Sequence, residues 1–106
     1  MNLATLDMQR MRAAAEQATS ALRTLANADR LLLLCQLSQG EKSVGELEAL
    51  LDIRQPTLSQ QLAVLRNEGL VNTRRDGKRI FYSVADPRTL QILATLYQLY
   101  CADGEA

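Results

Sequence analysis

The clearest periodic pattern is a run of leucines at helical spacing in the second half of the chain. Leu58, Leu62 and Leu65 stand at i, i+4 and i+7, which places them on one face of a helix. The opposite face carries the polar residues Gln55, Ser59, Gln60 and Asn67. Gly69 ends this helix, because glycine readily adopts the positive φ that helix C-termini need. The pattern predicts a helix that starts at about Gln55, has a proline in its first turn and is buried on one side only.

A β-hairpin is predicted immediately after this helix. The apolar segments Leu70-Val71 and Ile80-Phe81-Tyr82 flank Asp76-Gly77, a dipeptide that favours a two-residue type I′ turn. Basic residues crowd both sides of that turn: Arg74, Arg75, Lys78 and Arg79. A polar helix face beside a basic hairpin is typical of a winged helix-turn-helix. We expect the helix-turn-helix at about residues 43–68 and the wing at about residues 70–84.

Four further helices complete the predicted fold, at residues 5–26, 28–37, 44–51 and 87–101. The second of them carries four leucines and Cys35, so it is expected in the centre of the core. Ser43 and Glu46 match a capping box at the start of the third, and Asp86 precedes a proline at the start of the last. The sequence therefore predicts one mainly α domain, residues 1–106, with a small β-hairpin.

The first and last helices have more apolar surface than one small domain covers. The first carries a narrow stripe of Met11, Ala15, Ala18, Leu22 and Leu25. The last is apolar on two faces, one with Ile92, Leu96 and Leu99 and one with Leu90, Leu93, Ala94, Tyr97 and Cys101. Packing within one chain would explain part of this surface. A homodimer seam formed by both helices explains all of it.

Charge and composition narrow the function further. The net charge is zero, but six basic residues against two acids lie between Arg54 and Arg79, so positive charge is concentrated on the predicted helix and wing. Histidine is absent, and with it the commonest general base and metal ligand. The chain shows no arrangement of nucleophile, base and oxyanion donors, so we expect neither an enzyme nor a cofactor. Without a signal peptide or membrane span, we expect a cytoplasmic protein that has no membrane partner and keeps its cysteines reduced.

These features predict binding to double-stranded DNA. The start of the second helix of a helix-turn-helix enters the major groove, so Gln55, Thr57, Ser59 and Gln60 are expected near base edges. Arg54 and Arg66 are expected on phosphates. The four basic residues of the wing are expected along the DNA backbone or in a minor groove. Each polar residue alone would also fit an ordinary solvated surface, but their joint spacing favours a DNA site.

Three segments resemble the ArsR/SmtB family of dimeric winged-helix repressors. They are ANADRLLLLCQL, SVGELEALLDIRQPTLSQQLAVLRNEGLV and RRDGKRIFYSV, and the match covers about residues 20–101. The resemblance implies four helices, a β-hairpin and a fifth helix, with a symmetric dimer through the first and last helices. It also implies a palindromic operator with half-sites about one duplex turn apart.

The resemblance also bears on the inducer. Many family members bind metal through a CVCDL-type motif, but the matching segment here, Ser43 to Leu47, contains no cysteine. The last helix has no histidine, so we expect no metal site. The positions of Cys35 and Cys101 are similar to those in the BigR, SqrR and HlyU subgroup. This similarity implies a repressor that senses reactive sulfur species or oxidants by linking these cysteines through a disulfide or polysulfide bridge, which releases the operator.

Other interpretations stay open at this point. A metal-responsive repressor of the same fold would bind zinc or cadmium tightly, and a winged-helix regulator could lack a small-molecule inducer. A thiol oxidoreductase would need a C-x-x-C motif, which the chain lacks. A pure protein-interaction module would use the same helices but would not explain the basic hairpin.

Overall fold

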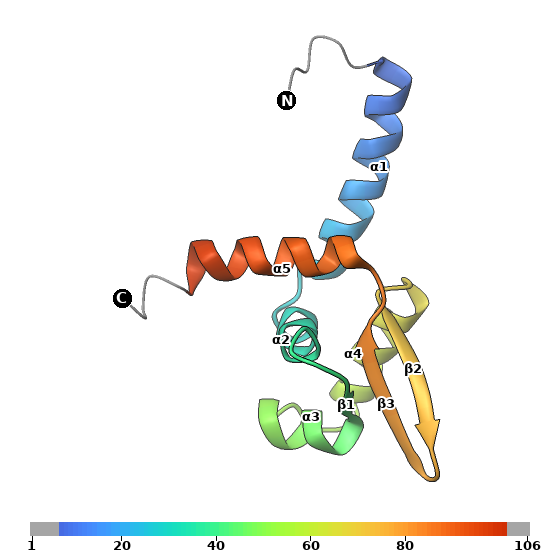
Figure 1. Ribbon diagram of the computed structural model, residues 1–106, viewed down its shortest axis with the longest axis vertical. Helices are drawn as coiled ribbons and strands as arrows, with labels where there is room; N and C mark the ends of the chain where they lie inside the picture. The colour runs from blue at the N-terminus through green and yellow to red at the C-terminus, as the bar shows by residue number, and fades with distance from the viewer. Residues whose placement is uncertain (1–6, 102–106) are drawn as a thin grey trace.

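Five helices and a three-stranded antiparallel sheet form the protein in the computed structural model, which describes residues 7–101. The elements in chain order are α1 (Met8–Leu25), α2 (Ala28–Leu37), β1 (Lys42–Ser43), α3 (Val44–Leu51), α4 (Thr57–Asn67), β2 (Val71–Asp76), β3 (Arg79–Val84) and α5 (Pro87–Tyr100). Helix α1 rises away from the other elements, and the β2–β3 hairpin projects at the opposite end (Figure 1). The predicted winged helix-turn-helix fold is confirmed. Residues 5 and 6, which we expected in the first helix, lie outside the described residues.

Side-chain caps fix the starts of several helices where the sequence predicts them. Ser43 and Glu46 form a reciprocal capping box at α3: the Ser43 N–H donates to Glu46 Oε1 at 2.9 Å, and the Glu46 N–H donates to Ser43 Oγ at 3.2 Å. Asn27 caps α2, and Asp86 caps α5 ahead of its N-terminal proline. Each cap satisfies an N–H group that has no partner within its own helix.

The hydrophobic core lies between α2, α3, α4 and the base of the hairpin. Leu58, Leu62 and Leu65 of α4 are 0 %, 2 % and 0 % exposed, which confirms the one-sided pattern of this helix. The other fully buried large side chains are Leu33, Leu34 and Leu47. Burying one such side chain contributes about 1.5–3 kcal/mol. The core therefore holds α4 in place and leaves its polar face outside.

The prediction that all of α2 lies in the centre of the core is wrong for two positions. Leu33, Leu34 and Leu37 face inward, whereas Leu32 is 47 % exposed and Cys35 is also exposed. The reason is geometric. Residues three apart share a helix face, and Leu32 and Cys35 lie on the face opposite the buried Leu33, Leu34 and Leu37. A run of leucines alone does not tell which of them is inside.

The sheet contains one strand that the sequence does not reveal. β1 pairs with β3 in the register Lys42↔Tyr82 and Ser43↔Phe81, which gives the order β1-β3-β2. A two-residue strand is too short to show any alternation of apolar and polar residues. Its pairing fastens the start of α3 to the wing.

The hairpin turn also differs from the prediction. Asp76 pairs with Arg79, so the two-residue loop is Gly77-Lys78 rather than Asp76-Gly77. Within the described chain the only non-glycine residue with positive φ is Asp52, and Gly77 has φ +64°. A positive φ at the first loop position alone matches a type II′ turn, which has glycine there. No helix in residues 7–101 is long and apolar enough to cross a membrane.

Candidate nucleic-acid interface and thiol groove

The turn between α3 and α4 ends later than the sequence predicts. Helix α3 stops at Asp52, whose backbone is left-handed with φ 53°, and α4 begins at Thr57, two residues after the expected start at Gln55. Pro56 precedes the helix and offers no side-chain cap. Gln55 fills that role, because its side-chain oxygen accepts both the N–H of Ser59, at 3.2 Å, and the Ser59 hydroxyl.

This capping divides the residues expected to meet DNA bases. All four, Gln55, Thr57, Ser59 and Gln60, are exposed. The oxygen of Gln55 and the hydroxyl of Ser59 bond to each other, which leaves the Gln55 amide nitrogen, Thr57 and Gln60 facing solvent. The sequence alone does not reveal this pairing, because it depends on where the helix begins.

Two further residues expected on phosphates flank this helix. Arg66 is exposed near the end of α4. The Arg54 side chain is 86 % exposed and lies 3.9 Å from Asp52, whose side chain is 91 % exposed. Such an exposed pair is weak, so Arg54 can exchange this partner for a phosphate.

Arg74 of the wing is held by a carboxylate. Its Nε and Nη2 donate to the two oxygens of Glu41 at 3.0 and 2.6 Å. This hydrogen bond lowers the pKa of the Glu41 carboxyl below its ordinary value and raises the pKa of the Arg74 guanidinium. Arg74 is therefore tied to the segment just before β1.

Arg79 makes a second connection from the wing to the start of α3. Its Nη2 donates to Ser43 Oγ at 3.2 Å and lies 3.7 Å from Glu46 Oε1. The same serine and glutamate form the capping box, and their hydrogen bonds lower the pKa of the Glu46 carboxyl, with a smaller contribution from Arg79. A cap at a helix start is in this way part of the contact that holds the wing.

Phe81 lies beneath both of these arginines. The guanidinium carbons of Arg74 and Arg79 are 4.6 and 4.8 Å from the centre of its ring, within the range of a cation–π contact. Arg75 and Lys78, in contrast, have no ion pair within the described chain and are exposed near the tip. The four wing cations that the sequence groups together are all exposed but form two sets. Arg74 and Arg79 are held by Glu41, Ser43 and Glu46, whereas Arg75 and Lys78 have no ion pair in the described chain.

The two cysteines stand on α2 and at the end of α5, two helices that are far apart in the sequence and line one groove. Cys35 lies on α2, and Cys101 caps the C-terminus of α5, where its N–H donates to the Tyr97 carbonyl at 2.8 Å. Both are exposed as free thiols. The pKa of the Cys35 thiol is raised, first by burial and then by the charge of Cys101.

A groove of about 600 Å³ separates these two helices and has Cys35 in its wall. On the α5 side it is lined by Leu90, Leu93, Ala94 and Tyr97, which follow the spacing i, i+3, i+4 and i+7. Cys101 comes one turn after Tyr97 on the same face. The Cys35 side chain is exposed and forms part of the groove wall.

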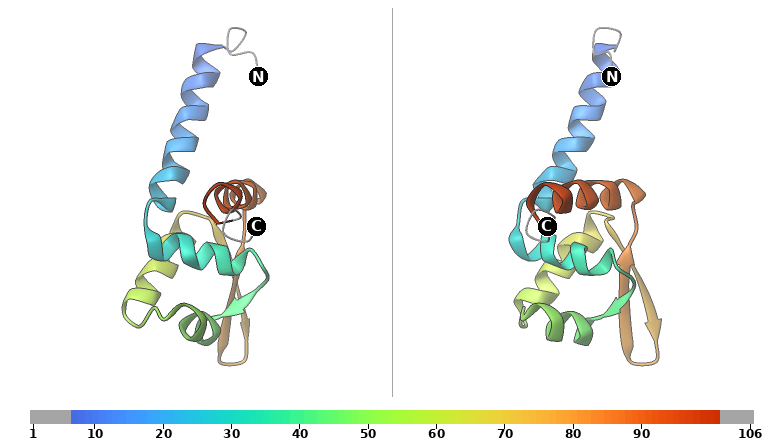
Figure 2. Two further views of the ribbon diagram at one scale, coloured as in Figure 1. Left: turned by 90° about the vertical axis from the view of Figure 1, so that its left-hand side faces the viewer. Right: turned by 60° about the vertical axis from the view of Figure 1, so that its left-hand side comes forward.

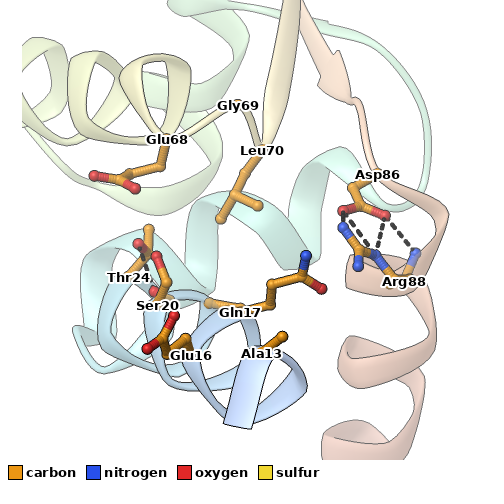
Figure 3. A pocket seen from close by; sticks show the side chains of 11 residues that line it. Ala13, Glu16, Gln17, Ser20, Thr24, Glu68, Gly69, Leu70, Asp86 and Arg88 are labelled. Carbon is orange, nitrogen blue, oxygen red and sulfur yellow. Dashed lines mark hydrogen bonds and ion pairs between the residues drawn. The ribbon is translucent and has the colours of Figure 1, made fainter. Parts of the chain in front are cut away.

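A second hollow, of about 580 Å³, lies between α1 and the start of α5 (Figure 3). Its lining is polar: Gln17 of α1 points toward the side of the Asp86–Arg88 ion pair, which has a length of 2.8 Å, whereas Glu16 lies on the opposite side near Ser20. It contains neither cysteine. Among the described residues no group of three or more His, Cys, Asp or Glu side chains is placed to hold a metal ion.

A short helix, a turn, a second helix with an exposed polar face and a basic β-hairpin define the winged helix-turn-helix class of regulatory proteins. Residues 27–73 match the family model described as "Bacterial regulatory protein, arsR family". The chain belongs to this family and is a transcriptional regulator, not an enzyme.

Individual relatives are similar along nearly the whole chain. The "Biofilm growth-associated repressor" of Agrobacterium fabrum is 49% identical over 105 residues, which cover 99% of this chain and 90% of the relative. The crystal structure of the transcriptional repressor BigR from Xylella fastidiosa has a TM-score of 0.84 and 45% identity, covering 91% of this chain and 98% of BigR. Reduced HlyU from Vibrio cholerae has a TM-score of 0.83 and 41% identity, covering 88% of this chain and 98% of HlyU.

Proposed function

We propose that the protein is a cytoplasmic, homodimeric repressor that binds a palindromic operator and releases it when reactive sulfur species or oxidants link Cys35 to Cys101. The observation that carries the sensing part is the position of two exposed free thiols on α2 and at the end of α5, the two helices that line one groove. The similarity to proteins named as repressors supports the direction of regulation.

The exposed surface of α1 and α5 supports a dimer through these helices. Met8 and Leu22 of α1 are 59 % and 57 % exposed, and Leu99 of α5 is 62 % exposed. Small residues of α1, together with Ile92, line a further hollow of about 330 Å³ between the two helices. A second copy would cover this surface, and the N-terminal part of α1 stands clear of the rest of the chain in all three ribbon views (Figures 1 and 2).

On DNA, the exposed groups at the start of α4 would face base edges. Thr57 and Gln60 can hydrogen-bond to bases, and Gln55 can donate from its amide nitrogen while its oxygen caps the helix. Arg54, Arg66, Arg75 and Lys78 would contact phosphates. Arg74 and Arg79 would act mainly by holding the wing against β1 and α3.

Linking Cys35 to Cys101 would couple α2, which packs on α4, to α5, which belongs to the proposed dimer seam. A fixed bridge between these helices would change how each α4 is held relative to the dimer axis. The two recognition helices would then no longer match half-sites one duplex turn apart. A direct disulfide requires Cα atoms about 4.4–6.8 Å apart, and inserted sulfur atoms would bridge a longer gap.

Operator binding under defined thiol chemistry tests this proposal. Binding sites are first selected from randomised duplex DNA with reduced protein, and fluorescence anisotropy then follows separate additions of persulfide, peroxide and zinc. Intact mass is measured on each sample. We expect release with persulfide together with a mass change that joins Cys35 and Cys101. Persulfide-induced release that persists in both the Cys35→Ser and Cys101→Ser variants would refute the sensing mechanism.

The same experiment distinguishes the remaining functions. Release by zinc alone would identify a metal-responsive repressor. Release by none of the three would leave a DNA-binding regulator whose cysteines only pack. Failure to select any duplex would refute DNA binding itself.

A further inference from the structure

Among residues 7–101, those that line the groove beside Cys35 are all uncharged. Its remaining lining residues are Ser38, Gln39 and Gln98, which are polar but neutral. The walls contributed by Leu90, Leu93 and Tyr97 are apolar. Any molecule that approaches the Cys35 sulfur through this groove must leave part of its hydration shell without gaining an ion pair.

We propose that this groove selects the inducer, favouring sulfur donors that carry an uncharged, apolar group over anionic donors such as glutathione persulfide. The inference rests on the proposed sulfur-sensing function and adds the chemical class of the molecule that delivers the sulfur. The apolar group lies against Leu90, Leu93 and Tyr97, and the terminal sulfur of the donor meets Cys35.

The reaction in the groove is a sulfur transfer followed by closure of the bridge. The Cys35 thiolate attacks the terminal sulfur of a persulfide R–S–SH. The S–S bond of the donor breaks, and R–S⁻ leaves and takes a proton to become RSH. The Cys101 thiolate then attacks the Cys35 sulfur and displaces HS⁻. The balance is two thiols plus R–S–SH giving one disulfide, RSH and H₂S. A second donor molecule supplies the extra sulfur atom of a trisulfide bridge and leaves as RSH.

Desolvation explains the expected preference. A carboxylate brought against an apolar wall loses hydration that no cation in this groove replaces. An apolar group instead gains from leaving water. Small differences in apolar contact within a protein pocket change selectivity by about 10–200-fold. We therefore expect a preference of roughly tenfold for the uncharged donor, at the low end of this range because the groove is open.

The test compares benzyl persulfide with glutathione persulfide on the full-length protein. Intact mass follows the rate at which each donor forms the Cys35–Cys101 bridge. The rate with benzyl persulfide is divided by the rate with glutathione persulfide. This ratio is then divided by the ratio of the rates at which the same two donors react with a small free thiol, which removes the difference in their intrinsic reactivity. Wild-type protein should give a corrected ratio of roughly ten. Ala94→Lys places a cation in the groove and should lower the ratio several-fold, mainly by accelerating glutathione persulfide.

Gln91→Lys is the matched control, because it adds the same charge to an exposed position of α5 that does not line the groove. It should keep the wild-type ratio. Leu90→Gln, which retains neutrality but removes apolar wall, should slow only the benzyl donor, and circular dichroism checks that each variant is folded.

The outcomes separate this inference from the proposed function. A corrected wild-type ratio near one, or equal ratios in Ala94→Lys and Gln91→Lys, would overturn selection by the groove while the bridging reaction itself stands. If neither donor linked the cysteines, the proposed sensing function would fail first, and the inference with it.

Discussion

The wing offers a sharp test of how its positive charges are used. Arg75 and Lys78 are exposed without an ion pair in the described chain, so replacing both with alanine should remove direct contacts to DNA phosphates. Phe81→Leu is the matched change on β3, opposite Arg74. It keeps every charge but removes the ring on which Arg74 and Arg79 rest.

The two variants should change different properties of operator binding: its salt dependence in Arg75→Ala/Lys78→Ala and its affinity in Phe81→Leu. Each phosphate contact contributes about 0.9 to the slope of log affinity against log salt, so losing two contacts on each of two wings should reduce the slope by roughly 3.6. Between 50 and 200 mM salt, the wild-type protein should then lose roughly 100-fold more affinity than the variant. Exposed cation–π contacts are worth about 0.5–1 kcal/mol each, so Phe81→Leu should weaken binding several-fold and leave the slope unchanged.

Fluorescence anisotropy with the selected operator, repeated at four or more salt concentrations, measures both quantities. Circular dichroism and sedimentation of each variant check that fold and assembly are intact. The division of the wing into two sets would be wrong if the Arg75→Ala/Lys78→Ala variant kept the wild-type slope. It would also be wrong if Phe81→Leu lowered the slope by a similar amount.

Three further results are expected from stability and thiol chemistry. Leu58→Ala, at a fully buried position of α4, should cost about 2–5 kcal/mol in urea unfolding, whereas Leu50→Ala, which is exposed, should cost less than about 1 kcal/mol; equal losses would contradict the core described here. The pKa of Glu41 is lowered from 4.5, so the stabilisation from its pairing is complete above that value and is lost as the pH falls through the lower folded pKa. Thermal unfolding between pH 6 and 3 should show a shallower acid loss for Glu41→Gln, and an unchanged profile would argue against the ion pair. Burial is the main cause of the raised pKa of Cys35, so its alkylation rate in Cys101→Ser should keep rising above pH 9.0, and a plateau below that pH would contradict the burial.

Local signals in the sequence account for most of the secondary structure. The capping box at Ser43 and Glu46, the Asp86 cap and the glycine after α4 act over a few residues, so the sequence locates these helix ends closely. The start of α4 is less predictable. A proline fits either just before a helix or in its first turn, and here the side chain of Gln55 completes the cap from outside the helix.

The sequence by itself determined the helical order, the one-sided burial of α4 and the basic hairpin, because periodicity, caps and turn residues act locally. Only the tertiary structure decided which wing arginines pair with a carboxylate. Glu41 and Arg74 are 33 residues apart, and they meet because β1 and β2 both pair with β3. The same holds for the thiols. Sequence places Cys35 in a leucine-rich helix, but only the tertiary structure shows that it is exposed and that it lines a groove with α5 in which no described residue is charged. Contacts between distant segments depend on how whole elements pack, and no local pattern encodes them.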